Sequence, residues 1–125
     1  MSDGLIGVIV SHGSLGESFL GAVRQITGAV DGLLAVTNDG CDRETLQLRL
    51  ASAIGDRPAI VFTDLPSGSC LQAAAGYLRA HDEVAVVAGV NLAMLLDFVY
   101  HRDMPATEAA ARAVAKGGQA VRAFP

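Results

Sequence analysis

Two kinds of hydrophobic pattern alternate along this chain: short continuous apolar runs, and longer segments in which apolar residues recur every three or four positions. Continuous runs are typical of strands that are buried on both faces of a parallel sheet, and the longer spacing is typical of helices. Strands are therefore predicted at residues 5–10, 33–37, 59–63 and 84–88. Helices are predicted at residues 16–27, 43–53, 69–80, 92–101 and 107–116.

Local signals at the helix ends support this assignment. Asp42 and Asn91 precede two of the predicted helices and are suited to accept hydrogen bonds from their first turns. Gly55 follows one of these helices and Pro105 the other, and both residue types commonly end helices.

The alternation of strands and helices predicts an α/β protein with a three-layer α/β/α architecture. Its central sheet is expected to be mainly parallel, with four strands and helices on both faces. After Gly117 and Gly118, residues 120–124 are predicted to add a short C-terminal strand, although the sequence does not indicate its pairing partner.

Length and composition fit one domain over residues 1–125, since most single cores are about 100 to 150 residues long. Hydrophobic residues make up 51% of the chain but aromatic residues only 5%, so the core must consist of Ala, Val, Leu and Ile. The net charge of −4 and the scattered basic residues argue against nucleic-acid binding. We expect a cytoplasmic protein, because the N-terminus lacks a signal-peptide pattern and the apolar region 84–96 is too short to cross a bilayer.

His12 is the first candidate functional residue, because it follows the first predicted strand within Ser11-His12-Gly13-Ser14. Ligands of open α/β sheets bind at the carboxyl ends of the strands. A histidine there can serve as a nucleophile, an acid or base, or a metal ligand. The alternative is an imidazole that only packs and hydrogen bonds.

Asp64 is the second candidate, because it follows the third predicted strand. If the first and third strands are neighbours, Asp64 can meet His12, fix its tautomer through Nδ1–H and leave Nε2 free as a nucleophile. In the alternative interpretation, Asp64 only caps the turn that follows it.

A small polar turn, Ser67-Gly68-Ser69, opens the third predicted helix. Backbone N–H groups at a helix start bind anions, and Gly68 allows a phosphate to approach closely. Such turns are common helix caps, so the signal depends on the histidine and carboxylate expected at the same edge. Together these residues predict phosphohistidine chemistry.

Other motifs give little support to other activities. Nucleotide-binding glycine fingerprints and clustered Cys/His metal sets are absent from the sequence, so neither a metal nor a cofactor is expected. His81 and His101 lie near helix ends and are expected to bond terminal carbonyls. Cys41 and Cys70 are expected to be free thiols, although Cys70 at a helix start could pair with His12 as a nucleophile.

Three segments resemble the enzyme IIA domain of the mannose family of the phosphoenolpyruvate-dependent sugar phosphotransferase system. They are Gly7-Val8-Ile9-Val10-Ser11-His12-Gly13, then Phe62-Thr63-Asp64 with Ser67-Gly68-Ser69, and Val87-Ala88-Gly89-Val90-Asn91-Leu92-Ala93-Met94-Leu95. The third is the most distinctive of them. With the matching order of elements, the resemblance covers essentially the whole chain.

The resemblance implies a phosphotransferase component for sugar transport that uses a phosphohistidine intermediate. His12 would accept a phosphoryl group on Nε2 from the histidine phosphocarrier protein and pass it to a separate IIB component. Asp64 would be the Nδ1 partner, and Ser67, Gly68 and Ser69 would hold the phosphoryl group. The resemblance also implies a homodimer, often formed through an exchanged C-terminal strand, that reaches the membrane only through the transporter complex.

The family turn usually reads Asp-x-x-Gly-Gly-Ser-Pro, whereas here Ser67 replaces the first Gly and Cys70 replaces Pro. This departure leaves open a regulatory module, in which the phosphorylation of His12 controls another protein without sugar transport. A third hypothesis is a metal-binding or chelatase-like protein, because His12-Gly13-Ser14 also occurs in tetrapyrrole chelatases. The sequence shows no second His or Cys beside His12, which weakens that hypothesis.

Overall fold

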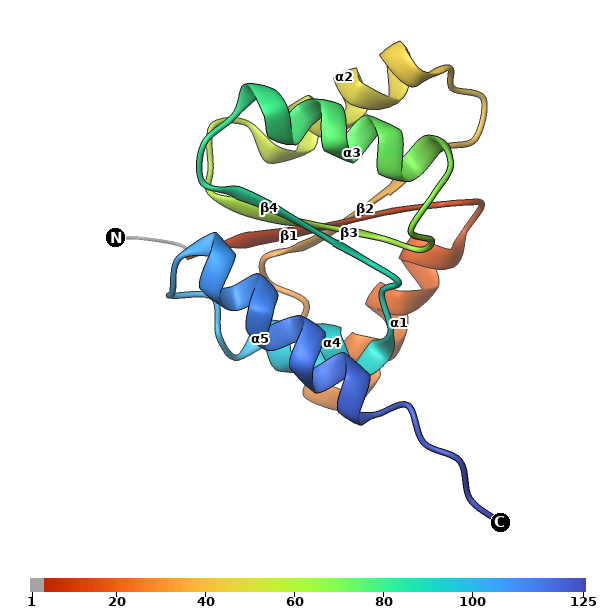
Figure 1. Ribbon diagram of the computed structural model, residues 1–125, viewed down its shortest axis with the longest axis vertical. Coiled ribbons are helices and arrows are strands. Elements are labelled where there is room, and N and C mark those ends of the chain that lie inside the picture. Colours follow the sequence, from red (N-terminus) through yellow and green to blue (C-terminus); the bar gives the residue numbers. More distant parts are fainter. Residues whose placement is uncertain (1–3) are drawn as a thin grey trace.

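The computed structural model describes residues 4–125 and has a parallel sheet between two layers of helices (Figure 1). The strands are β1 (Ile6–Ser11), β2 (Leu33–Thr37), β3 (Ala59–Thr63) and β4 (Val84–Ala88). The helices are α1 (Leu15–Thr27), α2 (Arg43–Ile54), α3 (Ser69–Ala80), α4 (Leu92–Val99) and α5 (Ala106–Gln119). The predicted three-layer α/β/α class is confirmed, and the predicted boundaries of the four strands agree to within a residue.

All pairings within the sheet are parallel, and the strand order is β2-β1-β3-β4. Strands β1 and β3 are therefore central neighbours, with Ile9 paired to Phe62 across them. Every residue of both strands is buried. This explains why their sequences are continuous apolar runs, since both faces of the sheet are covered.

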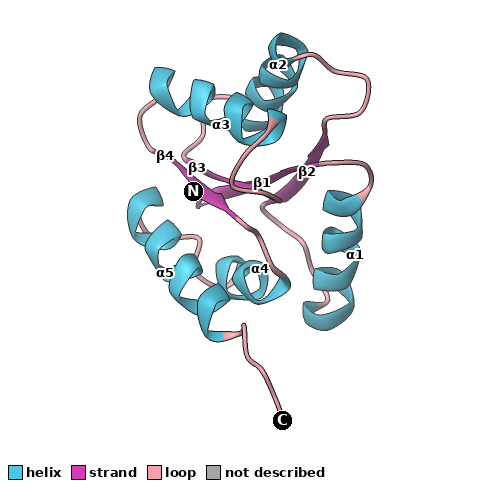
Figure 2. Ribbon diagram, turned by 45° about the vertical axis from the view of Figure 1, so that its right-hand side comes forward, coloured by secondary structure: helices cyan, strands magenta, loops and turns pink. Residues whose placement is uncertain are grey.

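Each face of the sheet contributes to a separate core. Helices α2 and α3 cover one face, and helices α1, α4 and α5 cover the other (Figure 2). Val8 and Val10 pack on the first side, while Ile9 and Phe62 pack on the second. Phe62 meets Phe98 of α4 edge to face, with ring centroids 5.4 Å apart. On this side, α5 contributes the small buried residues Ala106, Ala109, Ala113 and Gly117.

The predicted helix caps are present. The Asp42 carboxylate accepts a hydrogen bond from the Thr45 backbone N–H at 2.8 Å, and the Asn91 side-chain oxygen accepts one from the Met94 backbone N–H at 3.0 Å. Gly55 ends α2 as expected. Among the described residues, no helix is both long enough and apolar enough to cross a bilayer.

Asn91 and Gly117 join α4 to α5. The side-chain amide of Asn91 donates to the carbonyl of Gly117 at 3.0 Å. Gly117 is buried, and a Cβ there would lie 2.5 Å from Cγ of Met94. The predicted end of the last helix at Lys116 is therefore too early, because Gly117 serves as a packing position inside the helix.

The structure corrects the predicted C-terminal strand at residues 120–124, which is not formed. Ala120 follows the last turn of α5, and residues 121–125 run away from the body of the molecule without regular structure (Figure 1). Val121 and Phe124 are 75% and 82% exposed. A strand requires a neighbouring strand for its backbone hydrogen bonds, and this tail leaves the helix layer on a path away from the sheet.

Candidate phosphoryl-transfer site

After the two central strands, β1 and β3, the chain turns toward opposite faces of the sheet. After β1 the chain enters α1 on one side of the sheet, and after β3 it enters α3 on the other side (Figure 2). In open α/β sheets, such a reversal of strand order leaves a crevice at the carboxyl ends of the strands, and ligands bind there. His12 follows β1 and Asp64 follows β3, so both predicted residues lie at this crevice.

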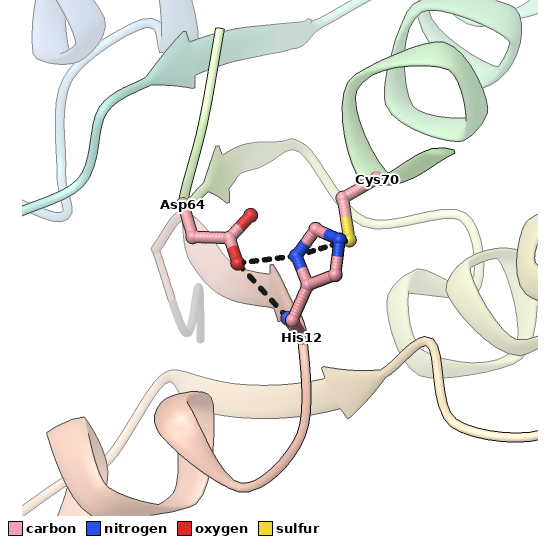
Figure 3. Close-up of side chains that lie close together, drawn as sticks. All are labelled: His12, Asp64 and Cys70. Atoms are coloured by element: carbon pink, nitrogen blue, oxygen red, sulfur yellow. Dashed lines mark hydrogen bonds and ion pairs between the residues drawn. The ribbon is translucent and has the colours of Figure 1, made fainter. Parts of the chain in front are cut away.

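His12 and Asp64 form a direct pair, as the sequence predicts for neighbouring strands (Figure 3). Nδ1 of His12 lies 2.7 Å from Oδ2 of Asp64, and the same oxygen accepts the His12 backbone N–H at 2.9 Å. Oδ1 of Asp64 accepts the backbone N–H of Leu65 at 3.0 Å. Asp64 therefore orients the imidazole and also supports the following turn, so it does more than cap that turn.

The surroundings of this pair favour an ionised carboxylate beside an accessible imidazole. The His12 side chain is 50% exposed, whereas that of Asp64 is only 9% exposed. Burial tends to raise the pKa of Asp64, but the hydrogen bonds from the backbone and ring of His12, together with its charge, outweigh burial and lower that pKa. An ionised Asp64 accepts Nδ1–H and leaves Nε2 as the nitrogen with a free lone pair.

The Ser67-Gly68-Ser69 turn is exposed beside this pair and leads into α3. Gly68 has φ +90°, a value that L side chains rarely adopt, and a Cβ there would meet no atom within 4 Å. The first N–H groups of a helix lack partners within the helix, so the start of α3 can accept an anion. Ser69 Oγ accepts the side-chain N–H of Asn38 at 3.3 Å.

Cys70 lies in the first turn of α3 and is fully buried. Its Sγ is 4.0 Å from Nδ1 of His12, so the imidazole is bordered by a carboxylate and a thiol (Figure 3). Burial and the nearby Asp64 carboxylate raise the pKa of Cys70 to about 11, whereas a hydrogen bond with Ser69 lowers it slightly. The thiol is therefore neutral near pH 7, which opposes a role as a nucleophile.

The other histidines take the positions predicted for them. Nδ1 of His81 is 2.9 Å from the carbonyl oxygen of Tyr77, on whose ring His81 stacks. Nδ1 of His101 is 2.8 Å from the carbonyl oxygen of Asp97. Each of these rings is thus engaged by residues four positions before it, and His12 is the histidine that lies at the crevice.

Sequence reasoning missed Asn38 as a neighbour of the site and underrated the closeness of Cys70 to His12. Asn38 directly follows β2, and the ends of parallel strands meet at one edge, so its position did carry a signal. Cys70 lies one residue beyond the recognised turn. Its contact with His12 depends on the direction in which α3 leaves the sheet, which residue patterns do not give.

Comparison with known proteins shows the family of this chain. A family model described as the PTS system fructose IIA component matches residues 7–115. The chain belongs to this family of IIA components. It is thus a component of a sugar phosphotransferase system, with partners in that system and a phosphotransferase role.

Individual proteins are similar to this IIA component in sequence or in fold. The sorbose-specific EIIA component of Klebsiella pneumoniae is 28% identical over 95 residues, which cover 74% of this chain and 70% of that protein. The mannose/sorbose-specific IIA subunit of Enterococcus faecalis has a TM-score of 0.85 at 25% identity and covers 98% of this chain and 96% of its own. The EIIA component of Streptococcus agalactiae has a TM-score of 0.88 at 19% identity, with coverage of 96% and 97%.

Proposed function

We propose that this IIA component carries a phosphoryl group on Nε2 of His12, between the histidine phosphocarrier protein and a separate IIB component. The observation that supports this proposal is the 2.7 Å contact between Nδ1 and Asp64 on an imidazole that is half exposed. In the proposal the protein works in the cytoplasm as a homodimer, and it contacts the membrane only through the transporter complex.

In the transfer step, the Nε2 lone pair of His12 attacks the phosphorus of the donor phosphohistidine. The bond between phosphorus and the donor nitrogen breaks, and the donor ring, which is protonated on its other nitrogen, leaves as neutral imidazole. The His12 ring, which keeps its Nδ1 proton, becomes positively charged, and the Asp64 carboxylate offsets this charge. Phosphoryl transfer depends mainly on such positioning and electrostatic stabilisation.

The turn before α3 would hold the transferred group. The hydroxyl of Ser69 and the backbone N–H groups of Ser67 and Gly68 are suited to donate hydrogen bonds to phosphoryl oxygens. The Asn38 amide donates to Ser69 Oγ at 3.3 Å and so supports this side chain from the end of β2. Transfer to IIB repeats the first step in reverse, with the acceptor nucleophile entering in line.

The test is to incubate the protein with phosphoenolpyruvate, enzyme I and the histidine phosphocarrier protein and to record its intact mass. We expect an acid-labile phosphoryl adduct on the wild type and on His81→Ala, and none on His12→Ala. His81→Ala is the matched control, because His81 is engaged within its own helix. An adduct that persists in His12→Ala would refute the proposed acceptor.

The second half of the cycle is tested by mixing the isolated phosphoprotein with a mannose-family IIB component. We expect loss of the adduct from this chain and gain of the same mass on IIB. If His12 is phosphorylated but the group does not move to IIB, the carrier role is wrong and the regulatory role remains.

A further inference from the structure

Three different potential metal ligands converge at the crevice. His12 comes from the end of β1, Asp64 from the end of β3, and Cys70 from the first turn of α3 (Figure 3). One nitrogen, one carboxylate oxygen and one sulfur from these residues all lie within 4.8 Å of one another. Imidazole, carboxylate and thiolate together are a donor set that suits Zn²⁺.

We propose that His12, Asp64 and Cys70 bind a zinc ion through Nδ1, a carboxylate oxygen and Sγ. Tetrahedral Zn²⁺ with ordinary bond lengths places neighbouring ligand atoms about 3.4 to 3.6 Å apart. The observed separations are 2.7 Å from Nδ1 to Oδ2 and 4.0 Å from Nδ1 to Sγ. Opening the first by about 0.7 Å and closing the second by about 0.5 Å brings these two pairs to those values. The third pair, the carboxylate oxygen and Sγ, lies within 4.8 Å.

Charge balance also favours this metal. A thiolate and a carboxylate bring two negative charges, which Zn²⁺ neutralises, so the assembled site places no net charge in a buried position. Cys70 is fully buried, and its thiol must lose a proton to bind a metal ion. Coordination to a divalent cation removes that proton, which passes to solvent.

Metal binding has a consequence for the phosphoryl carrier, and this part rests on the proposed function. In the pair with Asp64, the proton of the neutral ring is on Nδ1 and the lone pair is on Nε2. Zinc on Nδ1 requires the opposite tautomer, with the proton on Nε2. Nε2 then has no lone pair with which to attack phosphorus, so zinc binding and phosphorylation of His12 exclude each other.

The metal site is tested without any phosphotransfer protein. The full chain is titrated with Zn²⁺ by calorimetry and with Co²⁺, whose bond to a thiolate gives a charge-transfer absorption. We expect one metal ion per chain, with that absorption in the wild type and in Cys41→Ser. Cys70→Ser should lose the absorption and bind Zn²⁺ at least about tenfold more weakly. Cys41 is the matched control, because it is the other free thiol of the described chain.

His12→Ala is a second test that remains valid if Cys70→Ser does not fold. His12 is exposed, and its loss leaves both cores intact. This substitution should also abolish one-to-one zinc binding. The proposal is overturned if the wild type shows no cobalt–thiolate absorption. It is equally overturned if Cys41→Ser loses the absorption, or if Cys70→Ser and His12→Ala bind as the wild type does.

The link to phosphorylation is tested by adding Zn²⁺ to the phosphorylation reaction. The adduct level of each protein is normalised to its own level in the presence of a chelator. Wild type should be inhibited in proportion to zinc occupancy, whereas Cys70→Ser should resist zinc up to about tenfold higher concentrations. Equal inhibition of both proteins would place the effect on enzyme I or the phosphocarrier and refute the exclusion. If no protein is phosphorylated but the wild type still binds zinc, the proposed function alone is contradicted.

Discussion

A single oxygen of Asp64, Oδ2, accepts both the backbone N–H of His12, at 2.9 Å, and its ring Nδ1, at 2.7 Å. The carboxylate therefore fixes the position of the main chain and the rotation of the ring together. A residue that held the ring alone would still allow His12 to shift along the crevice. This double contact gives Asp64 an effect on both the geometry and the charge of the proposed acceptor.

Asp64→Asn should slow phosphorylation of His12 by about 10² to 10⁴-fold. Asparagine keeps the approximate shape but removes the negative charge that offsets the phosphorylated ring, and it allows the wrong tautomer. The rate is measured from quenched time points by intact mass. Asp42→Asn is the control, because this carboxylate caps α2 and should leave the rate unchanged. Equal rates for Asp64→Asn and wild type would contradict the assigned role.

The lowered pKa of Asp64 predicts a specific dependence of stability on pH. A carboxyl group whose pKa is lower in the folded state stabilises the fold above its unfolded pKa, about 3.9, and that contribution disappears as the pH falls through the folded value. The difference in unfolding free energy between wild type and Asp64→Asn should therefore shrink as pH falls from about 5 to about 2. Denaturant titrations across this range measure it. A difference that grows toward acid pH would reverse the sign and contradict the prediction.

The two cysteines should differ in reactivity. Cys70 is fully buried with a pKa of about 11, whereas Cys41 is half-buried. At about pH 7.5, iodoacetamide should label Cys41 well before Cys70, because the thiolate is the reactive form. Labelling of Cys70 should rise as the pH approaches 11. Peptide mapping reports each site, and rapid labelling of Cys70 at neutral pH would show that its thiol is more accessible or more acidic than the structure indicates.

Two adjacent glycines in α5 provide a matched pair. A Cβ at Gly117 would lie 2.5 Å from Cγ of Met94 and 3.1 Å from Oδ1 of Asn91, whereas a Cβ at Gly118 would meet no atom within 4 Å. Gly117→Ala should destabilise the protein by about 1 to 3 kcal/mol. Gly118→Ala should stabilise it by up to about 1 kcal/mol, because alanine favours helices. Urea denaturation of both variants tests this, and equal effects would contradict close packing between α4 and α5.

Local patterns predicted most of the fold, because strands covered on both faces leave continuous apolar runs and capping residues mark helix starts. The meeting of His12 with Asp64 followed from one added condition, that β1 and β3 are neighbours. The exposed path of residues 121–125 could not be predicted, because an apolar run resembles a strand whether or not a neighbouring strand is available. The end of the last helix was predicted too early for a similar reason. Glycine commonly ends helices, but Gly117 lies inside α5 and permits contact with Met94.

The distinctive segment around Asn91 also has a structural basis that its sequence did not reveal. The side-chain oxygen of Asn91 caps α4, and its amide donates to α5 at Gly117. One residue therefore ties together two helices that pack on the same face of the sheet. This role requires both a donor and an acceptor group, so Asn91→Asp would retain the cap and lose the link to α5.

The pairing of β1 with β3 has a consequence for the order in which function emerges during synthesis. The His12–Asp64 contact spans 52 residues, and β3 must form and dock beside β1 before that contact exists. Non-local contacts of this kind form late, because the intervening chain must first be ordered. A nascent chain that has exposed β1, α1 and β2 therefore carries the histidine without its carboxylate. Under the proposed function, the chain can accept a phosphoryl group only after β3 has docked beside β1.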